Sequence, residues 1–353
     1  MSQSHLHGFK VAGISTCVPP HTVDNLEAGK DFSAVEVRKV VSMAGVRFRQ
    51  VVSPEVTSVD LCTDAAQRLL DQLGWAPESI TGLIMVTQSP DYFLPSSSCV
   101  VHARLGLGVH CASFDVGLGC SGYPYGLYLA AAMLQGGGHQ RILVLHGETP
   151  SRFVDPDDHA ATLLFSDAGS ATALEHTGRA QDEAWFGLYT DGSGVDSLII
   201  RGGAFRDPTP VNPHDLRLAM DGVSVFNFTI KRVPEMIQDT LAYAQLAVPD
   251  IDAFIFHQTS RFIIKHLVKK CELPEERVPF ILEDMGSCGG PSVPLTVTRS
   301  LTKSPSPLDK SSGSGPVRLM LLGYGVGLSW GAAIMTLDEG TPLLHHIYQE
   351  SKV

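Results

Sequence analysis

The hydrophobic positions along the chain predict buried strands that alternate with amphipathic helices. Nearly continuous apolar runs, typical of strands covered on both faces, occupy residues 9–15, 80–87, 141–146 and 251–256. Helical spacing of apolar positions predicts helices over residues 34–44, 57–73, 96–107 and 223–245. The second of these begins at Thr57 or Ser58 and stops before Gly74, which are common helix-boundary residues. The alternation predicts a layered α/β architecture.

The second half of the sequence repeats the order of the first. The strand that begins at Ile80 has a counterpart at Ile251, 171 residues later, and the run that begins at Asp115 has one at Asp284, 169 residues later. Two matches in one order at nearly one offset indicate a duplication. We therefore predict two related halves, residues 1–175 and 176–353. Two further strands are predicted at residues 317–323 and 328–335, and surface loops at 202–221 and 303–316.

Residues 113–134 carry the strongest chemical signal. A short apolar strand turns through glycines and continues as a long helix of small and apolar residues, with Cys120 at the turn. A helix N-terminus offers unpaired N–H groups and partial positive charge, so we expect the pKa of Cys120 to be lowered and its thiol to act as a nucleophile. The alternative is a buried structural cysteine, which is the usual role of this residue type.

Composition narrows the function classes. The chain has 26 Lys and Arg against 37 Asp and Glu, and this net charge of −11 argues against a general nucleic-acid binder. No apolar run is suited to span a bilayer, and the first residues lack the pattern of a signal peptide, so we expect a cytoplasmic protein without a membrane partner. His5 and His7 are expected in a frayed, polar end. The seven cysteines contain no C-x-x-C pair, which favours reduced thiols and predicts no metal site.

A histidine and two glycine-rich turns complete the candidate chemistry. His257 follows a buried strand, at the end where functional groups gather in such sheets, and could act as a base or hydrogen-bond donor. The alternative is a core histidine bonded to the backbone. The turn at residues 286–291 enters a helix, and the turn at residues 323–328 could direct N–H groups at a developing oxyanion.

These motifs together resemble the ketosynthase III family of the thiolase fold. In order, they are Gly-Cys-Ser-Gly around Cys120, residues 165–171, residues 190–194, His257-Gln, residues 286–294 and residues 325–331. The resemblance covers about residues 8–337 and implies a duplicated five-layer αβαβα fold. It implies Cys120 as the acyl-accepting nucleophile, His257 as the histidine of the site, and an oxyanion hole built from the amides of Cys120 and Val326.

The resemblance also implies a homodimer. We expect the interface at residues 112–135, whose helix is nearly all apolar, with Leu94 reaching into the acyl pocket of the neighbouring subunit. The donor would be a thioester of coenzyme A or of an acyl carrier protein, with no further cofactor. An acidic carrier is expected to dock on Arg261, Lys265 and Lys269, which recur every four residues, although an ordinary solvated helix face has the same pattern.

The departures from the family pattern point to a modified reaction. Ser287 stands where the family has the asparagine that, with the histidine, holds the thioester oxygen during decarboxylation. Lys39 and His159 stand where bacterial members grip the adenine of coenzyme A with tryptophan and arginine, and Phe262 replaces a further arginine. The altered grip favours a carrier-protein donor, and the chain is closest in character to ketosynthase-III-like acyltransferases of secondary metabolism, including polyketide and antibiotic biosynthesis.

The resulting hypothesis is transfer of an acyl group through Cys120 to a hydroxyl acceptor, with His257 as the base and malonyl among the candidate acyl groups. One alternative is a decarboxylative ketosynthase III that works despite Ser287 and forms a β-ketoacyl product. Another is a catalytically silent partner subunit that only binds acyl chains, against which the intact Cys120 and His257 count.

Overall fold

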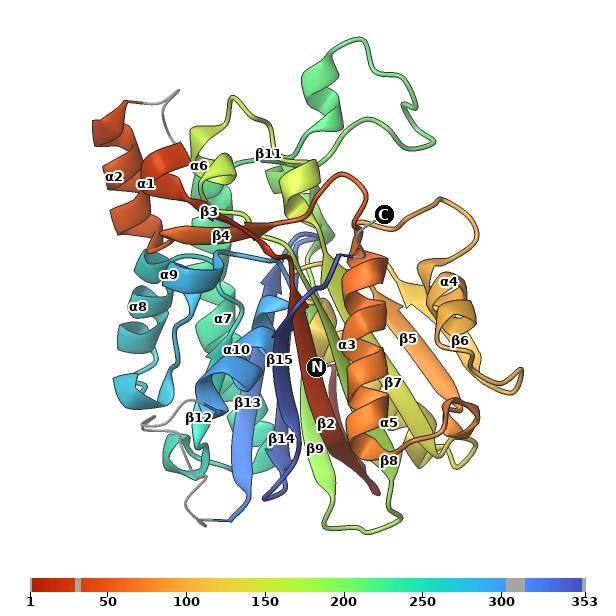
Figure 1. The fold of residues 1–353 in the computed structure, drawn as a ribbon. Helices are drawn as coiled ribbons and strands as arrows, with labels where there is room; N and C mark the ends of the chain where they lie inside the picture. Colours follow the sequence, from red (N-terminus) through yellow and green to blue (C-terminus); the bar gives the residue numbers. More distant parts are fainter. Residues whose placement is uncertain (1, 29–32, 303–314, 351–353) are drawn as a thin grey trace.

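Two β-sheets form the framework of the protein in a computed structural model that describes residues 2–28, 33–302 and 315–350 (Figure 1). The first sheet has the order β15 (Leu343–Ile347), β2 (Phe9–Val18), β8 (Ala168–His176), β7 (Arg141–Glu148), β5 (Gly82–Val86) and β6 (Ala112–Val116). The second has the order β1 (Gln3–His7), β9 (Glu183–Thr190), β14 (Ser329–Leu337), β13 (Val317–Gly325) and β12 (Ala253–Phe256).

The strand order confirms the duplication. In the first sheet β2, β8 and β7 are antiparallel neighbours, and β7 is parallel to β5. In the second, β9, β14 and β13 are antiparallel neighbours, and β13 is parallel to β12. Because β5 and β12 are the two strands matched in sequence, the two halves share one topology. The exact division at residue 175 stays a prediction.

Helices complete the five predicted layers. α5 (Gly122–Gln135) and α10 (Ser292–Leu301) pack between the sheets and contact strands of both. α3 (Ser58–Leu73) and α4 (Ser97–Arg104) cover the outer face of the first sheet, and α7 (Gly222–Ala244) packs with α8 (Arg261–Lys270) outside the second (Figure 1). The αβαβα arrangement of the thiolase fold is thus confirmed. Among the described residues, no helix has the length and apolar character needed to cross a bilayer.

Local chemistry explains the best-predicted elements. The Asp60 carboxylate accepts a hydrogen bond of 2.7 Å from the N–H of Thr57, the residue before α3, and Gly74 ends that helix with a φ of 63°. All five residues of β5 are buried, as expected for a strand covered on both faces. α2 (Ala34–Ala44) has the predicted bounds, and α7 continues through Pro234.

Four parts of the β-structure differ from the sequence-based expectations. The segment expected to fray is β1, in which His5 stacks on Trp185 with ring centroids 5.0 Å apart. The strand β15 was not predicted; it pairs with β2 at the edge of the first sheet. The antiparallel pair of β3 (His21–Asp24) and β4 (Phe48–Val51) was also missed, as was β9. The expected loop at 303–316 falls almost wholly outside the described residues.

The remaining short helices and strands belong to neither of the two large sheets. They are α1 (Asn25–Ala28), α6 (His159–Thr162), α9 (Leu282–Met285), β10 (Leu198–Ile199) and β11 (Ala219–Met220). The segment between β10 and β11, part of the predicted insertion at 202–221, projects from the body of the molecule at the top of Figure 1.

Candidate active site

Cys120 lies in the turn between β6 and α5, as predicted, and is half-buried. The turn packs tightly on the strand β13: a Cβ atom added to Gly325 would lie 2.7 Å from the Cys120 Cβ and 2.9 Å from its Sγ. Burial raises the pKa of the Cys120 thiol to about 11, while hydrogen bonds from the backbone of Val326 and of Cys120 itself lower it. The expected lowering of the pKa is therefore wrong, because burial outweighs the amides.

His257 leaves the end of β12 and is 3% exposed. Its Nδ1 lies 2.8 Å from the Ser292 hydroxyl at the start of α10, and its carbonyl accepts a 3.2 Å hydrogen bond from the Tyr324 hydroxyl. Burial lowers the pKa of His257 to about 4, opposed by a hydrogen bond to the backbone of Gly289. The imidazole is therefore neutral near pH 7, with one ring nitrogen unprotonated, as a base requires.

Ser287 lies in the turn before α10 and is 2% exposed. Its main chain is fixed on both sides: its N–H donates to the Leu164 carbonyl at 2.9 Å, and its own carbonyl accepts from the Ser166 N–H at 2.9 Å. The structure brings Ser287, Cys120 and His257 to the wall of one cavity. The three residues expected to act together are therefore neighbours.

Two cavities meet at Cys120. One has a volume of about 370 Å³ and is lined by Cys120 and Val326 together with apolar side chains from Phe153, Val195, Ile199, Ile200 and Leu218. The other has a volume of about 400 Å³ and holds His257 and Ser287 among apolar side chains from Met43, Leu164, Val225, Phe226 and Phe262. Leu198 and Phe165 line both. No lysine or arginine is among the described residues that line either cavity.

Two further titratable residues near Cys120 were not predicted from the sequence. Glu148, at the end of β7, lines the first cavity and accepts hydrogen bonds from the Gln88 N–H at 2.8 Å and the Ser89 hydroxyl at 2.9 Å. Burial raises the pKa of Glu148 to about 8. Burial also lowers the pKa of the neighbouring His146 to about 3, with a smaller effect from His257. Their place at the end of an apolar strand is the signal that could have found them.

Other predicted residues lie apart from Cys120. Leu94 is 80% exposed and lines neither cavity in the single chain, so its proposed reach into a neighbouring subunit stays a prediction. Lys265 and Lys269 are exposed on α8, whereas Arg261 forms a 3.1 Å ion pair with Glu283. The predicted basic stripe therefore has two exposed lysines and one neutralised arginine.

Three positions depart from the family pattern for holding coenzyme A. Lys39 is exposed on α2, and His159 begins α6. Phe262 lines the second cavity and stacks on Phe226, with ring centroids 5.7 Å apart. An aromatic, uncharged wall thus stands where the resemblance leads one to expect an arginine.

Comparison with known proteins identifies the family. The sequence model described as 3-oxoacyl-[acyl-carrier-protein (ACP)] synthase III matches residues 114–192, and its C-terminal model matches residues 241–337. A β-ketoacyl-[acyl-carrier-protein] synthase III of Clostridium perfringens is 30% identical over 332 residues, covering 93% of this chain and 99% of the relative. The chain belongs to the ketosynthase III family.

Solved structures agree with this membership. A 3-oxoacyl-(acyl-carrier protein) synthase from Burkholderia xenovorans superposes with a TM-score of 0.92 at 37% identity, covering 98% of this chain and 99% of that one. The priming β-ketosynthase of the R1128 polyketide pathway superposes with a TM-score of 0.84 at 25% identity, covering 94% of this chain and 97% of that one. The protein is thus a transferase of the ketosynthase III type.

Proposed function

We propose that this ketosynthase III member transfers an acyl group from a thioester donor, through Cys120, to a hydroxyl acceptor and so forms an ester. The observation that carries the proposal is Ser287 beside Cys120 and His257 in one cavity, at the position of the family's asparagine. A condensing site must stabilise an enolate, and loss of one such donor costs about 10²–10³ in rate. Acyl transfer needs no enolate, only the nucleophile, a base and an oxyanion hole.

In the first step the Cys120 sulfur attacks the donor thioester. His257 takes the thiol proton. The raised pKa of the thiol and the lowered pKa of the imidazole both oppose this transfer, but the resulting imidazolium and thiolate stabilise each other by their opposite charges. The N–H groups of Cys120 and Val326 would bind the oxyanion of the tetrahedral intermediate, because the backbone of both already bonds the Cys120 thiol. The donor thiol leaves with a proton, and the acyl group remains on Cys120.

In the second step the acceptor enters by the cavity that holds His257. The imidazole takes the acceptor hydroxyl proton as the oxygen attacks the acyl-cysteine, and the same amides bind the second oxyanion. The carbon–sulfur bond then breaks, the ester leaves, and the imidazolium returns its proton to the Cys120 sulfur. A serine at position 287 leaves more room beside His257 than an asparagine would. The apolar side chains of Met43, Phe226 and Phe262 favour an acceptor with a hydrophobic body.

The cavity at Cys120 and Val326 supports an uncharged acyl group. A malonyl carboxylate placed there would face mainly apolar side chains with no lysine or arginine to pair with, which burial makes costly. The malonyl group named among the candidates is therefore disfavoured. The volume of about 370 Å³ is roughly a dozen times the ~30 Å³ share of one water molecule, so an acetyl group would leave most of it empty.

We further propose a homodimer and a carrier-bound donor. β6 lies at the edge of the first sheet, and such an edge can pair with a second copy, as expected for residues 112–135. The exposed Lys265 and Lys269 support docking of an acidic carrier, and the absence of cations from the described cavity walls disfavours tight binding of coenzyme A phosphates.

Decarboxylative condensation remains the second candidate. It is favoured by the relatives, which are named as 3-oxoacyl- and β-ketoacyl-carrier-protein synthases. A silent acyl-binding subunit is the third, and it predicts that no covalent acyl-enzyme forms.

The test is intact-protein mass spectrometry after incubation with a panel of acyl thioesters: acetyl, butyryl, hexanoyl, octanoyl and malonyl. We expect the hexanoyl or octanoyl mass on Cys120 to accumulate fastest. Cys120→Ala is the control that assigns the label. Exclusive labelling by malonyl would contradict the acyl preference, and absence of label from every donor would contradict the enzymatic function.

A further inference from the structure

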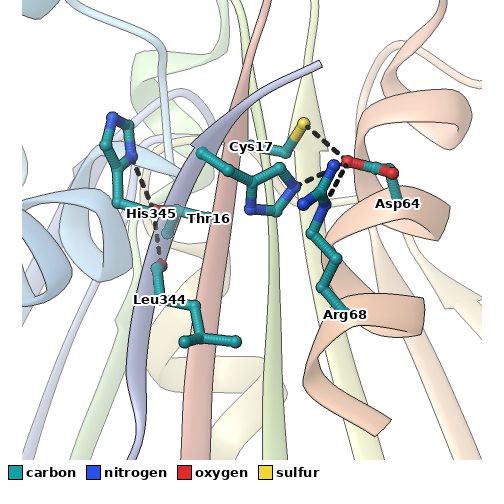
Figure 2. A network of polar contacts seen from close by, with 7 residues as sticks. Thr16, Cys17, Asp64, Arg68, Leu344 and His345 are labelled. Atoms are coloured by element: carbon teal, nitrogen blue, oxygen red, sulfur yellow. Dashed lines mark hydrogen bonds and ion pairs between the residues drawn. The ribbon is translucent and has the colours of Figure 1, made fainter. Parts of the chain in front are cut away.

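Three residues from distant parts of the chain converge where β15 meets the rest of the first sheet. Cys17 lies on β2, Asp64 on α3 and His346 on β15, and Figure 2 shows the Cys17 sulfur directed at the Asp64 carboxylate. The Asp64 Oδ2 atom lies 3.5 Å from the Cys17 Sγ and 2.6 Å from the His346 Nε2. All three candidate ligand atoms lie within 4.8 Å of one another.

The Asp64 Oδ2 atom has more hydrogen-bond donors around it than one oxygen can accept well. Arg68 also donates to the Asp64 Oδ2 atom, from its Nε at 3.2 Å, so three donors point at one oxygen. A carboxylate oxygen has about two lone-pair directions. The other ring nitrogen of His346, Nδ1, is buried without a partner among the described residues, so only the contact with Asp64 bears on which nitrogen carries the ring proton.

The ligand set has the chemistry of a zinc site. Zn²⁺ binds cysteine sulfur, histidine nitrogen and carboxylate oxygen at bond lengths of about 2.0–2.3 Å, which places tetrahedral ligand atoms roughly 3–4 Å apart. The three atoms are already near this spacing. A neighbouring cavity of about 760 Å³, lined by Arg68 and His346, gives an entry path and room for a water as fourth ligand.

We propose that Cys17, Asp64 and His346 bind a zinc ion that fixes β15 onto β2 and α3. Metal binding releases the thiol proton of Cys17 and moves the ring proton of His346 to Nδ1. One thiolate and one carboxylate balance the charge of Zn²⁺, so Arg68 keeps its hydrogen bond to the carboxylate, as partners of metal-bound carboxylates do.

The site is independent of the chemistry at Cys120 and could not be found from ligand spacing. Cys17 and Asp64 are 47 residues apart, and Asp64 and His346 are 282 residues apart. Without metal, Cys17 is fully buried, and burial followed by the charge of Asp64 raises the pKa of its thiol. A proton-bearing thiol at this place is inert, whereas a metal ion would deprotonate it.

The experiment uses the full-length protein stripped with a chelator and then titrated with Zn²⁺ and, separately, with Co²⁺. We expect one equivalent of Zn²⁺ by elemental analysis and calorimetry, a rise in Tm, and slower amide exchange in residues 343–347. Bound Co²⁺ should show the thiolate-to-metal charge-transfer band of a cysteine ligand.

Variants of two proposed ligands, compared with variants of similar residues nearby, test which side chains bind the metal. Cys17→Ser should abolish the charge-transfer band, and His346→Gln should weaken Zn²⁺ binding by about 100-fold or more. Loss of a residue that only hydrogen-bonds a metal ligand lowers metal affinity by about 10–100-fold, and loss of a ligand itself should lower it at least as much. Cys62→Ser, at another buried cysteine, and His345→Gln, on the same strand, should bind as wild type. Failure of Zn²⁺ to bind, or equal binding by His346→Gln and His345→Gln, would overturn the proposal and leave a hydrogen-bonded cluster. The His346 side chain is 13% exposed, whereas Cys17 is fully buried, so the comparison of the two histidine variants still decides the proposal if Cys17→Ser does not fold.

Discussion

The two halves of the molecule carry related turns, each with a cysteine, but the two cysteines differ in burial and surroundings. Cys120 precedes α5 in the first half, and Cys288 precedes α10 in the second. Cys120 is half-buried, lines both cavities and bonds the backbone of Val326. Cys288 is fully buried and packs in a small apolar cluster with Val18, Ala168 and Leu295. A cysteine at such a turn is therefore a candidate nucleophile only where a cavity and amide donors reach its sulfur.

The second turn supports the first. A Cβ atom added to Gly290 would overlap the ring of His146 and lie 2.6 Å from the Gly119 carbonyl oxygen, so the two turns pack backbone against backbone. The second turn also supplies Ser287 to the cavity beside Cys120. The first half thus carries the candidate nucleophile, and the second half supplies the turn that packs against it.

The largest effect should come from the nucleophile. We expect Cys120→Ala to abolish acyl-enzyme formation and to lower turnover by about 10⁴-fold or more, as removal of other covalent nucleophiles does. Cys288→Ala should keep the acylation and lose only stability. Mass spectrometry with peptide mapping measures both, and an acyl group found on Cys288 would reverse the assignment.

Alkylation at different pH values sharpens the contrast between the two thiols. Because the pKa of Cys120 is raised to about 11, its thiolate fraction, and hence its rate of reaction with iodoacetamide, should rise about tenfold per pH unit between pH 7 and 10. Cys288 should stay unlabelled in the folded protein, since burial raises the pKa of its thiol and hides the sulfur. A rate for Cys120 that is flat above pH 7 would contradict the raised pKa.

The contact between the turns predicts a stability effect. Gly290→Ala should destabilise the fold by about 1–3 kcal/mol, the usual cost of overpacking, because the methyl group meets His146 and the Gly119 carbonyl. Gly138→Ala is the control, since a Cβ there meets no atom within 4 Å. Urea unfolding of the two variants measures the difference; equal midpoints would show that the turns have room to separate.

The smallest effect is expected at the surface. Lys265→Glu combined with Lys269→Glu should raise the KM for a carrier-bound donor several-fold at low salt and less at high salt, because exposed charges are screened. Arg261, held by Glu283, should contribute less. An unchanged KM would show that the exposed face of α8 does not bind the carrier.

The sequence predicted the interior better than the edges. Apolar periodicity and caps located β5, α2 and α3, and motif order located Cys120, His257 and Ser287. It missed β1 and β15, whose polar or mixed residues become strands only by pairing with β9 and β2. The pKa of Cys120 was also misjudged, because a turn motif shows the helix amides but not the burial. Glu148 was missed for a similar reason: its place beside Cys120 depends on tertiary packing.

A single product analysis distinguishes acyl transfer without decarboxylation from condensation. The protein is first acylated on Cys120 with a hexanoyl thioester, then given malonyl thioester and a hydrophobic alcohol together, while carbon dioxide and product masses are followed. Ser287→Asn is run beside it, because an asparagine should restore the second enolate donor at the cost of ester formation. We expect the hexanoyl ester without carbon dioxide from the native protein and some carbon dioxide from the variant. A β-ketoacyl product with matching carbon dioxide from the native protein would contradict acyl transfer without decarboxylation.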